Sequence, residues 1–271
     1  MFELFTGRDN LGGVRMKAYA FHVQKGGVGK TTLSGNIGYL LSMFGRVLII
    51  DGDPQGSISS WLLADSSVPM KYELVDVLRG DVLVEKATIQ IRDNLSLMPS
   101  IPIQAGPGLK SYGETNLVSE PMIFIDLLEE VKLLQYDYVI FDLGPGMSLL
   151  EKAMLLACDE VVTPLTPEFL SIDGIEIFSS ELAKIQRSRR NTRLDGEIIH
   201  NKIILNNINR SFKRHNLIVD RFRKGVNNYR IFEIGQESKM AECQGVGLFL
   251  EEYFPESRVL PSLKDMASVL I

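Results

Sequence analysis

The chain has 271 residues, of which 45% are hydrophobic and 23% are charged. This composition excludes a mainly disordered chain, and the length suits one large α/β domain. No apolar run reaches about 18 residues, which excludes a membrane-spanning helix, and two cysteines cannot by themselves form a disulfide framework or a zinc site. The first residues lack the segments of a secretion signal, so we expect a soluble cytoplasmic protein.

We divide the chain into an N-terminal extension, residues 1–16, and one domain, residues 17–271. The extension lacks hydrophobic periodicity, and translation could begin at Met16. The apolar run Ala18–Val23 predicts a buried strand, and the periodicity after it predicts a helix over Thr31–Phe44. Further strands are predicted at Arg46–Asp51, Leu95–Met98, Tyr138–Asp142, Glu160–Thr163, Lys202–Asn206 and Arg230–Ile234, and further helices at Pro121–Leu134, Ile172–Gln186 and Phe212–Lys224. This alternation predicts an α/β fold with a mostly parallel, twisted sheet and helices on both faces.

A glycine-rich turn between the first strand and the first helix has the composition of a phosphate-binding loop. Glycine tolerates the backbone angles that turn several N–H groups inward, and the helix N-terminus adds unpaired donors. Lys30 would reach the β- and γ-phosphates, and the Thr31 hydroxyl would hold Mg²⁺. The usual motif G-x-x-x-x-G-K-[ST] is not met strictly, because Gln24 stands at its first position. We predict that nucleotide is bound by Lys25, Gly26, Gly27, Val28, Gly29, Lys30, Thr31 and Thr32.

The loop KGGVGKT resembles the deviant Walker A motif of the ParA/MinD family of ATPases, and the similarity extends from Met16 to about Pro255. The segment Asp51–Gly56, DGDPQG, resembles an element of the chromosome- and plasmid-partition members ParA and Soj. Asp142 ends a strand as in the family, but the Leu-Gly-Pro-Gly after it replaces the usual Thr-Pro-Pro. The resemblance implies a P-loop NTPase fold and a slow, partner-stimulated, Mg²⁺-dependent ATPase.

The resemblance also assigns roles to individual residues. Lys25 matches the lysine that crosses a dimer interface to touch the partner's ATP, so ATP would hold together a two-fold sandwich dimer. Asp53 matches the aspartate that orients the attacking water, and it is also expected at the metal. Asp51 would support the loop or the metal shell. Asp142 would hold Mg²⁺ through a water. The pair Asn206–Asn207 matches the position that contacts the adenine base, although asparagine pairs also occur in ordinary turns.

Positive charge is concentrated in one part of an acidic chain. Thirteen Lys or Arg and three acids lie between Lys184 and Arg230, a local charge of +10 within a net charge of −5. Such asymmetry favours a face for a polyanion, with a solvated basic helix as the alternative. The resemblance implies that the ATP-bound dimer binds duplex DNA without sequence specificity, through Arg221, Arg223 and Lys239. The aromatic residues of this region, Phe212 and Phe222, are expected to anchor its helix to the core.

The favoured function is therefore a DNA-partition ATPase that works with a ParB-type DNA-binding partner on the nucleoid. The alternative is a MinD-like positioning ATPase, which needs a basic amphipathic helix to bind membrane. The segment Pro261–Ile271 contains one Lys and one Asp, too little charge for that role, so we expect no membrane partner. A relative that positions a protein cargo stays open. A scaffold without turnover would require a damaged loop, and the loop is intact.

Overall fold

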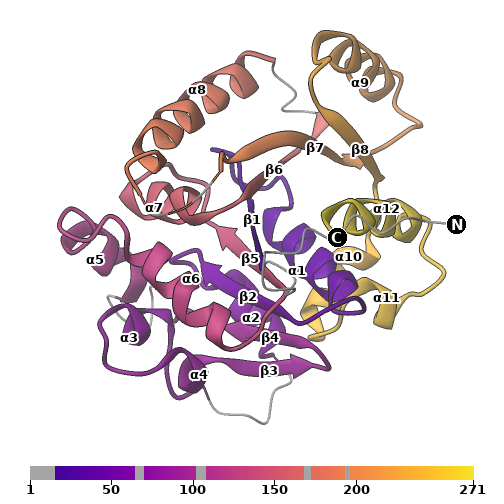
Figure 1. Cartoon of the computed structure of the whole chain (residues 1–271). Helices are drawn as coiled ribbons and strands as arrows, with labels where there is room; N and C mark the ends of the chain where they lie inside the picture. Colours follow the sequence, from indigo (N-terminus) through magenta and orange to yellow (C-terminus); the bar gives the residue numbers. More distant parts are fainter. Residues whose placement is uncertain (1–15, 65–69, 102–107, 168–171, 193, 195) are drawn as a thin grey trace, which may run out of the picture.

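The computed structural model describes residues 16–64, 70–101, 108–167, 172–192, 194 and 196–271. Its centre is one eight-stranded sheet in the order β3-β4-β2-β5-β1-β6-β7-β8 (Figure 1). Neighbouring strands are parallel except β3 and β4, which form an antiparallel edge. The strands are β1 Lys17–Phe21, β2 Val47–Gly52, β3 Ile89–Arg92, β4 Leu95–Met98, β5 Tyr138–Leu143, β6 Glu160–Leu165, β7 Ile199–Ile208 and β8 Arg230–Gly235.

Helices cover both faces of the sheet. One apolar cluster joins the sheet to α3, α5, α6, α7 and α8, and a second joins the opposite face to α1, α2, α10, α11 and α12. A smaller cluster packs α9 against β7. The helices are α1 Lys30–Leu41, α2 Ser57–Leu62, α3 Leu74–Leu78, α4 Val84–Ala87, α5 Gly108–Thr115, α6 Ile123–Leu133, α7 Leu149–Ala157, α8 Ile172–Arg189, α9 Lys213–Gly225, α10 Lys239–Gly245, α11 Leu250–Tyr253 and α12 Leu260–Leu270. None of the described helices is long and apolar enough to cross a membrane.

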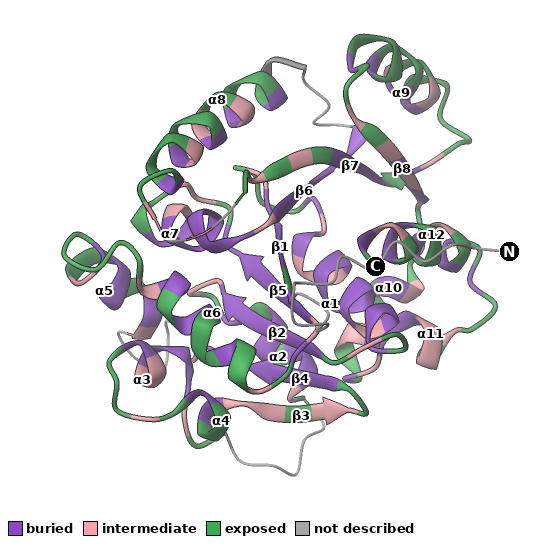
Figure 2. Ribbon diagram, viewed as in Figure 1, coloured by how far each residue is buried: buried purple, intermediate pink, exposed green. Residues whose placement is uncertain are grey.

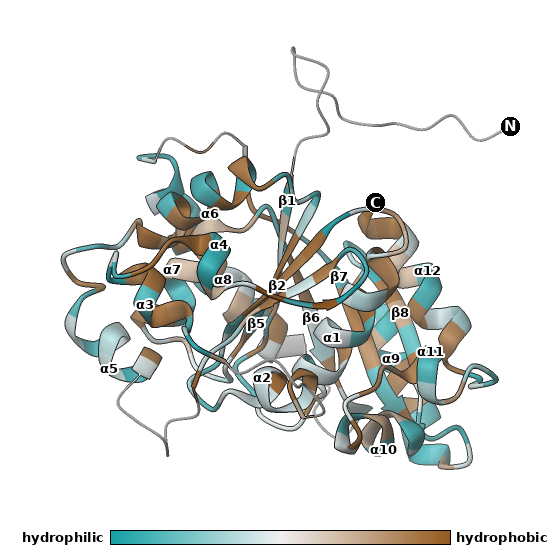
Figure 3. Cartoon of the chain, turned by 90° about the horizontal axis from the view of Figure 1, so that it is seen from below, coloured by the Kyte–Doolittle hydropathy of each residue, from teal (hydrophilic) through white to brown (hydrophobic). Residues whose placement is uncertain are grey.

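The central strands are buried because both of their faces are covered. Every residue of β2, β5 and β6 is buried (Figure 2), and the middle of the molecule is correspondingly hydrophobic (Figure 3). From β1, the chain goes to β2 on one side, and later to β6, β7 and β8 on the other. In parallel sheets, ligands bind beyond the carboxyl ends of the strands where the strand order reverses in this way. The fold therefore places the loop after β1 at the expected position of a binding site.

The predicted fold class is confirmed, as are the seven predicted strands and four predicted helices within a few residues at their ends. The edge strand β3 and the short helices were not predicted. The predicted N-terminal extension, apart from Met16, lies outside the described residues, so it stays a prediction.

Candidate nucleotide-binding site

The loop after β1 has the backbone of a phosphate-binding loop. Gly27 and Gly29 adopt φ angles of +73° and +92°, which residues with a side chain rarely adopt. Helix α1 begins directly afterwards at Lys30, so its unpaired N–H groups face the loop. The Lys30 ammonium donates a hydrogen bond to the Lys25 carbonyl, 2.8 Å away, and thus lies across the loop. Burial lowers the pKa of Lys30, while the carboxylates of Asp142, Asp53 and Glu151 oppose that shift.

The predicted trans-acting lysine lies at the outer part of the same loop. Lys25, Gly26 and Gly27 are exposed, whereas Lys30 is only 7% exposed. The two lysines of the motif therefore differ in environment: one faces into the site, and the other lies on the surface beside it.

Asn206 supports the loop from the end of β7. This buried side chain donates a hydrogen bond from its Nδ2 to the Val28 carbonyl, 3.0 Å away. A Cβ atom at Gly29 would lie 2.4 Å from the same Nδ2, so the loop and the amide are packed directly together. Asn207 is exposed and has a φ of +59°. The predicted base contact by either asparagine stays a prediction.

Two of the predicted carboxylates lie side by side on adjacent strands. Asp51, the residue before the last of β2, lies opposite Asp142 of β5 in the sheet register, and both are fully buried. The Asp51 carboxylate accepts hydrogen bonds from the Ser59 backbone N–H at 3.1 Å and from the Asp53 N–H at 3.2 Å. Burial raises the pKa of Asp51, and the nearby Asp142 raises it further. Asp51 therefore holds the turn after β2 against α2, which fits the supporting role predicted for it.

Asp142 has the properties of a metal-shell ligand. One carboxylate oxygen, Oδ1, accepts a hydrogen bond from the Ser34 hydroxyl at 2.9 Å. The other, Oδ2, is buried and has no hydrogen-bond partner among the described residues. Burial raises the pKa of Asp142 to about 6, although hydrogen bonds from Thr31 and Ser34 lower it. A buried oxygen of this kind beside a threonine hydroxyl fits Mg²⁺, which prefers carboxylate, hydroxyl and water oxygens.

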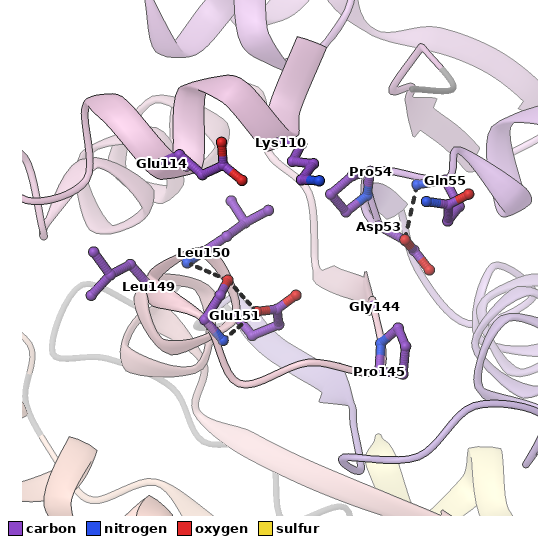
Figure 4. Close-up of a pocket in the computed structure, with 12 residues that line it drawn as sticks. Asp53, Pro54, Gln55, Lys110, Glu114, Gly144, Pro145, Leu149, Leu150 and Glu151 are labelled. Carbon is purple, nitrogen blue, oxygen red and sulfur yellow. Dashed lines mark hydrogen bonds between the residues drawn. The ribbon is translucent and has the colours of Figure 1, made fainter. Parts of the chain in front are cut away.

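Asp53 lies between the loop and a neighbouring pocket. Its Oδ1 accepts a hydrogen bond from the Gln55 N–H at 2.9 Å, and burial raises its pKa. Figure 4 shows this side chain at the edge of a pocket of about 630 Å³ between the turn after β2, the loop after β5, α5 and α7. The described lining includes Glu114 and Glu151 but no residue of the glycine loop. The pocket therefore adjoins the phosphate-binding loop and is separate from it.

The predicted DNA-contacting residues are partly engaged within the protein. Arg223 pairs with Glu233, and the Lys239 ammonium lies 2.6 Å from a carboxylate oxygen of Glu242. Arg221 is exposed on α9. Of the two phenylalanines expected in the core, Phe222 is 3% exposed, but the expectation for Phe212 was wrong because it is 57% exposed. Phe212 is the N-cap residue of α9 and has extended backbone angles. Its side chain is therefore not on the buried face of the helix.

Several residues at the site were not predicted. Ser34, the donor to Asp142, lies one turn after Lys30 on the same helix, and this spacing could have identified it. His22 follows β1 and is fully buried; burial, and then Lys30, lower its pKa to about 3, so the imidazole is neutral. Gln244 donates a hydrogen bond to the Thr32 hydroxyl at 2.6 Å. No motif marks Gln244, because 212 residues separate the two partners.

A parallel sheet that leads from its switch-point strand into a glycine loop and a Lys-Thr helix defines a P-loop nucleotide-binding protein. Residues 16–195 match the model of a family described as an AAA domain. An uncharacterized protein of Borreliella burgdorferi, BBD21, is 39% identical over 94% of this chain and 99% of its own. The sporulation initiation inhibitor protein Soj of Bacillus subtilis is 32% identical over 63% of this chain and 67% of its own. The chain belongs to the ParA/MinD family of P-loop ATPases.

Two solved structures share the fold. A candidate plasmid partition protein of Borrelia burgdorferi B31, bound to AMPPNP, has a TM-score of 0.73 with 21% identity, over 95% of this chain and 100% of its own. The septum site-determining protein MinD of Pyrococcus horikoshii OT3, complexed with Mg-ADP, has a TM-score of 0.72 with 20% identity, over 94% and 96%.

Proposed function

We propose that this member of the family is a DNA-partition ATPase that forms an ATP-dependent sandwich dimer and binds duplex DNA without sequence specificity. The observation that carries the proposal is the convergence of Lys30, Asp53 and Asp142 at the carboxyl ends of β1, β2 and β5. The similarity to Soj, and to a nucleotide-bound plasmid partition protein, supports the partition role.

The chain's own residues would carry out phosphoryl transfer mainly by positioning and by neutralising charge. The glycine-loop N–H groups and Lys30 would bind the β- and γ-phosphates, as the exposed loop and the inward ammonium allow. Thr31 and Asp142 would hold Mg²⁺, and this ion would neutralise phosphate charge. Asp53 would orient the attacking water from the turn after β2. We expect turnover to be slow and stimulated by a ParB-type partner.

The proposed dimer follows from the exposure of Lys25. Its side chain is exposed on the outer part of the loop, so a second copy packed against this face would bring its nucleotide near Lys25. A two-fold dimer would also double the number of basic faces, and DNA affinity rises steeply with the number of phosphate contacts. The ATP-bound dimer would thus bind the nucleoid, and hydrolysis would release it.

The experiment compares Asp53→Ala with Lys30→Ala. Asp53→Ala should still bind ATP and should accumulate the dimer, because only the placement of water is lost. Lys30→Ala should lose nucleotide affinity. Nucleotide binding is measured by calorimetry, and dimer formation by light scattering with ATP and Mg²⁺. A monomeric Asp53→Ala protein would contradict the role of Asp53, whereas unchanged nucleotide affinity in Lys30→Ala would refute the nucleotide site itself.

A further inference from the structure

Helix α10 is tied to the nucleotide loop by one side-chain hydrogen bond. The Gln244 Nε2 donates to the Thr32 Oγ1 at 2.6 Å, and both residues are half-buried. Thr32 is the last residue of the KGGVGKTT loop motif and the third residue of α1. The backbone N–H groups at this end of the helix have no partner within the helix, and they point where a phosphate binds. The bond therefore reaches the phosphate-binding end of α1.

The direction of this bond determines what the threonine hydroxyl can do. A hydroxyl has one hydrogen to donate and can accept two hydrogen bonds. Since Gln244 donates its amide hydrogen to Oγ1, the hydroxyl hydrogen of Thr32 is left to point elsewhere. We propose that Gln244 is a positioning residue, which turns the Thr32 hydroxyl so that its hydrogen is donated to a phosphate oxygen of the bound nucleotide. This inference rests on the proposed nucleotide site.

Other contacts hold the segment that follows Gln244 in place. Asn36 donates to the Thr32 carbonyl and accepts from the Leu250 N–H, each at 2.8 Å. The Trp61 indole donates to the Leu248 carbonyl at 3.1 Å. Because none of these bonds involves the Gln244 amide, its removal should leave α10 and α11 in position. The fold can therefore be kept while the hydrogen-bond direction at Thr32 is changed.

A double-mutant cycle tests the proposal, with Gln244→Leu, Thr32→Val and the combination of both. Affinity for AMPPNP with Mg²⁺ is measured by calorimetry, which avoids hydrolysis. Gln244→Leu should weaken binding by about 2- to 10-fold, the effect of one net hydrogen bond. In the Thr32→Val background the same change should have no effect, because no hydroxyl remains to be turned. Gln90→Ala, at an exposed position of the edge strand β3, serves as the matched control and should bind as wild type.

A second variant addresses the possibility that leucine disturbs packing. Gln244→Glu keeps the size of the side chain but can only accept when ionised, so the hydroxyl hydrogen would turn away from the phosphate. We expect a loss at least as large as in Gln244→Leu, and the Thr32→Val background corrects for the added charge. An equal loss in both backgrounds would show a purely structural role and overturn the proposal, as would unchanged affinity with Thr32 present. If wild type itself fails to bind AMPPNP, the nucleotide site fails, and the inference with it.

Discussion

Asp142→Asn should make the nucleotide-free protein more stable at high pH while abolishing the ATP hydrolysis that we propose to depend on Mg²⁺. Burial raises the pKa of Asp142 from its ordinary 3.8 to about 6. The folded state therefore holds the proton more tightly than the unfolded state does. The stability that this proton contributes is complete below the unfolded pKa and is lost as pH rises through the folded one. A shift of about 2 pKa units corresponds to about 3 kcal/mol, and roughly half of this stability is lost between pH 5 and pH 8.

The substituted amide stays neutral at every pH and can still accept the hydrogen bond from Ser34. It also removes the charge that raises the pKa of Asp51, which adds stability in the same direction. The measurement is urea unfolding, followed by the fluorescence of Trp61, the single tryptophan, without nucleotide and with a chelator. The free energies of wild type and variant are compared at pH 5 and pH 8.

The informative quantity is the difference in the free energy of unfolding between wild type and Asp142→Asn, not either free energy alone. A difference in unfolding free energy that widens by roughly 1 kcal/mol or more from pH 5 to pH 8 would support the reasoning. Parallel pH dependences would refute it, because they would mean that Asp142 titrates alike in the folded and unfolded states. Asp93 is exposed, and Asp93→Asn is measured alongside as the matched control.

Three further variants test the nucleotide site and the proposed DNA surface. Lys25→Ala should bind ATP as wild type does but fail to dimerise in light scattering; severe loss of affinity in the monomer would show that Lys25 acts within its own chain. Gly29→Ala should lose ATP affinity and about 1–2 kcal/mol of stability in urea, because φ is +92° and the new methyl group would lie 2.4 Å from a side-chain amide. Changing the three predicted DNA contacts to Glu should abolish DNA binding by the ATP-bound protein in a salt titration and leave dimerisation intact; retained binding with an unchanged salt slope would place the DNA surface elsewhere. The three predicted DNA contacts are Arg221, Arg223 and Lys239.

The elements predicted correctly are those whose signals are local. A strand such as β5 is apolar throughout because both faces of a parallel sheet are covered, and this can be read within six residues. The edge strand β3 has the sequence IQIR, is only half-buried and pairs on one side alone, so nothing in four residues distinguishes it from a loop. Phe212 shows the same limit, because its exposure depends on where α9 begins.

The residues of the candidate site likewise differ in whether a local signal in the sequence could reveal them. The proximity of Lys30 and Asp142 could be predicted because the carboxyl ends of parallel strands meet at one edge: Asp142 lies near the end of β5, and Lys30 begins the helix after the loop that follows β1. The bond from Gln244 to Thr32 could not, since it depends on how α10 packs on α1 across 212 residues. Likewise, the ion pairs of Arg223 and Lys239 depend on which acids the fold places beside them.

Asn206 shows why a role taken from position in the sequence can be incomplete. Its amide has two donor hydrogens and one acceptor oxygen, and the Val28 carbonyl uses one of the hydrogens. A second hydrogen and the oxygen remain, so contact with an adenine base is compatible with support of the loop. The two roles have different structural requirements. Contact with the base requires only that Asn206 lies at the end of β7, whereas support of the loop also requires that Gly29 has no side chain. A larger side chain at either Gly29 or Asn206 would clash with the other residue. The phosphate-binding loop and the expected base-contacting residue are therefore packed together as one unit.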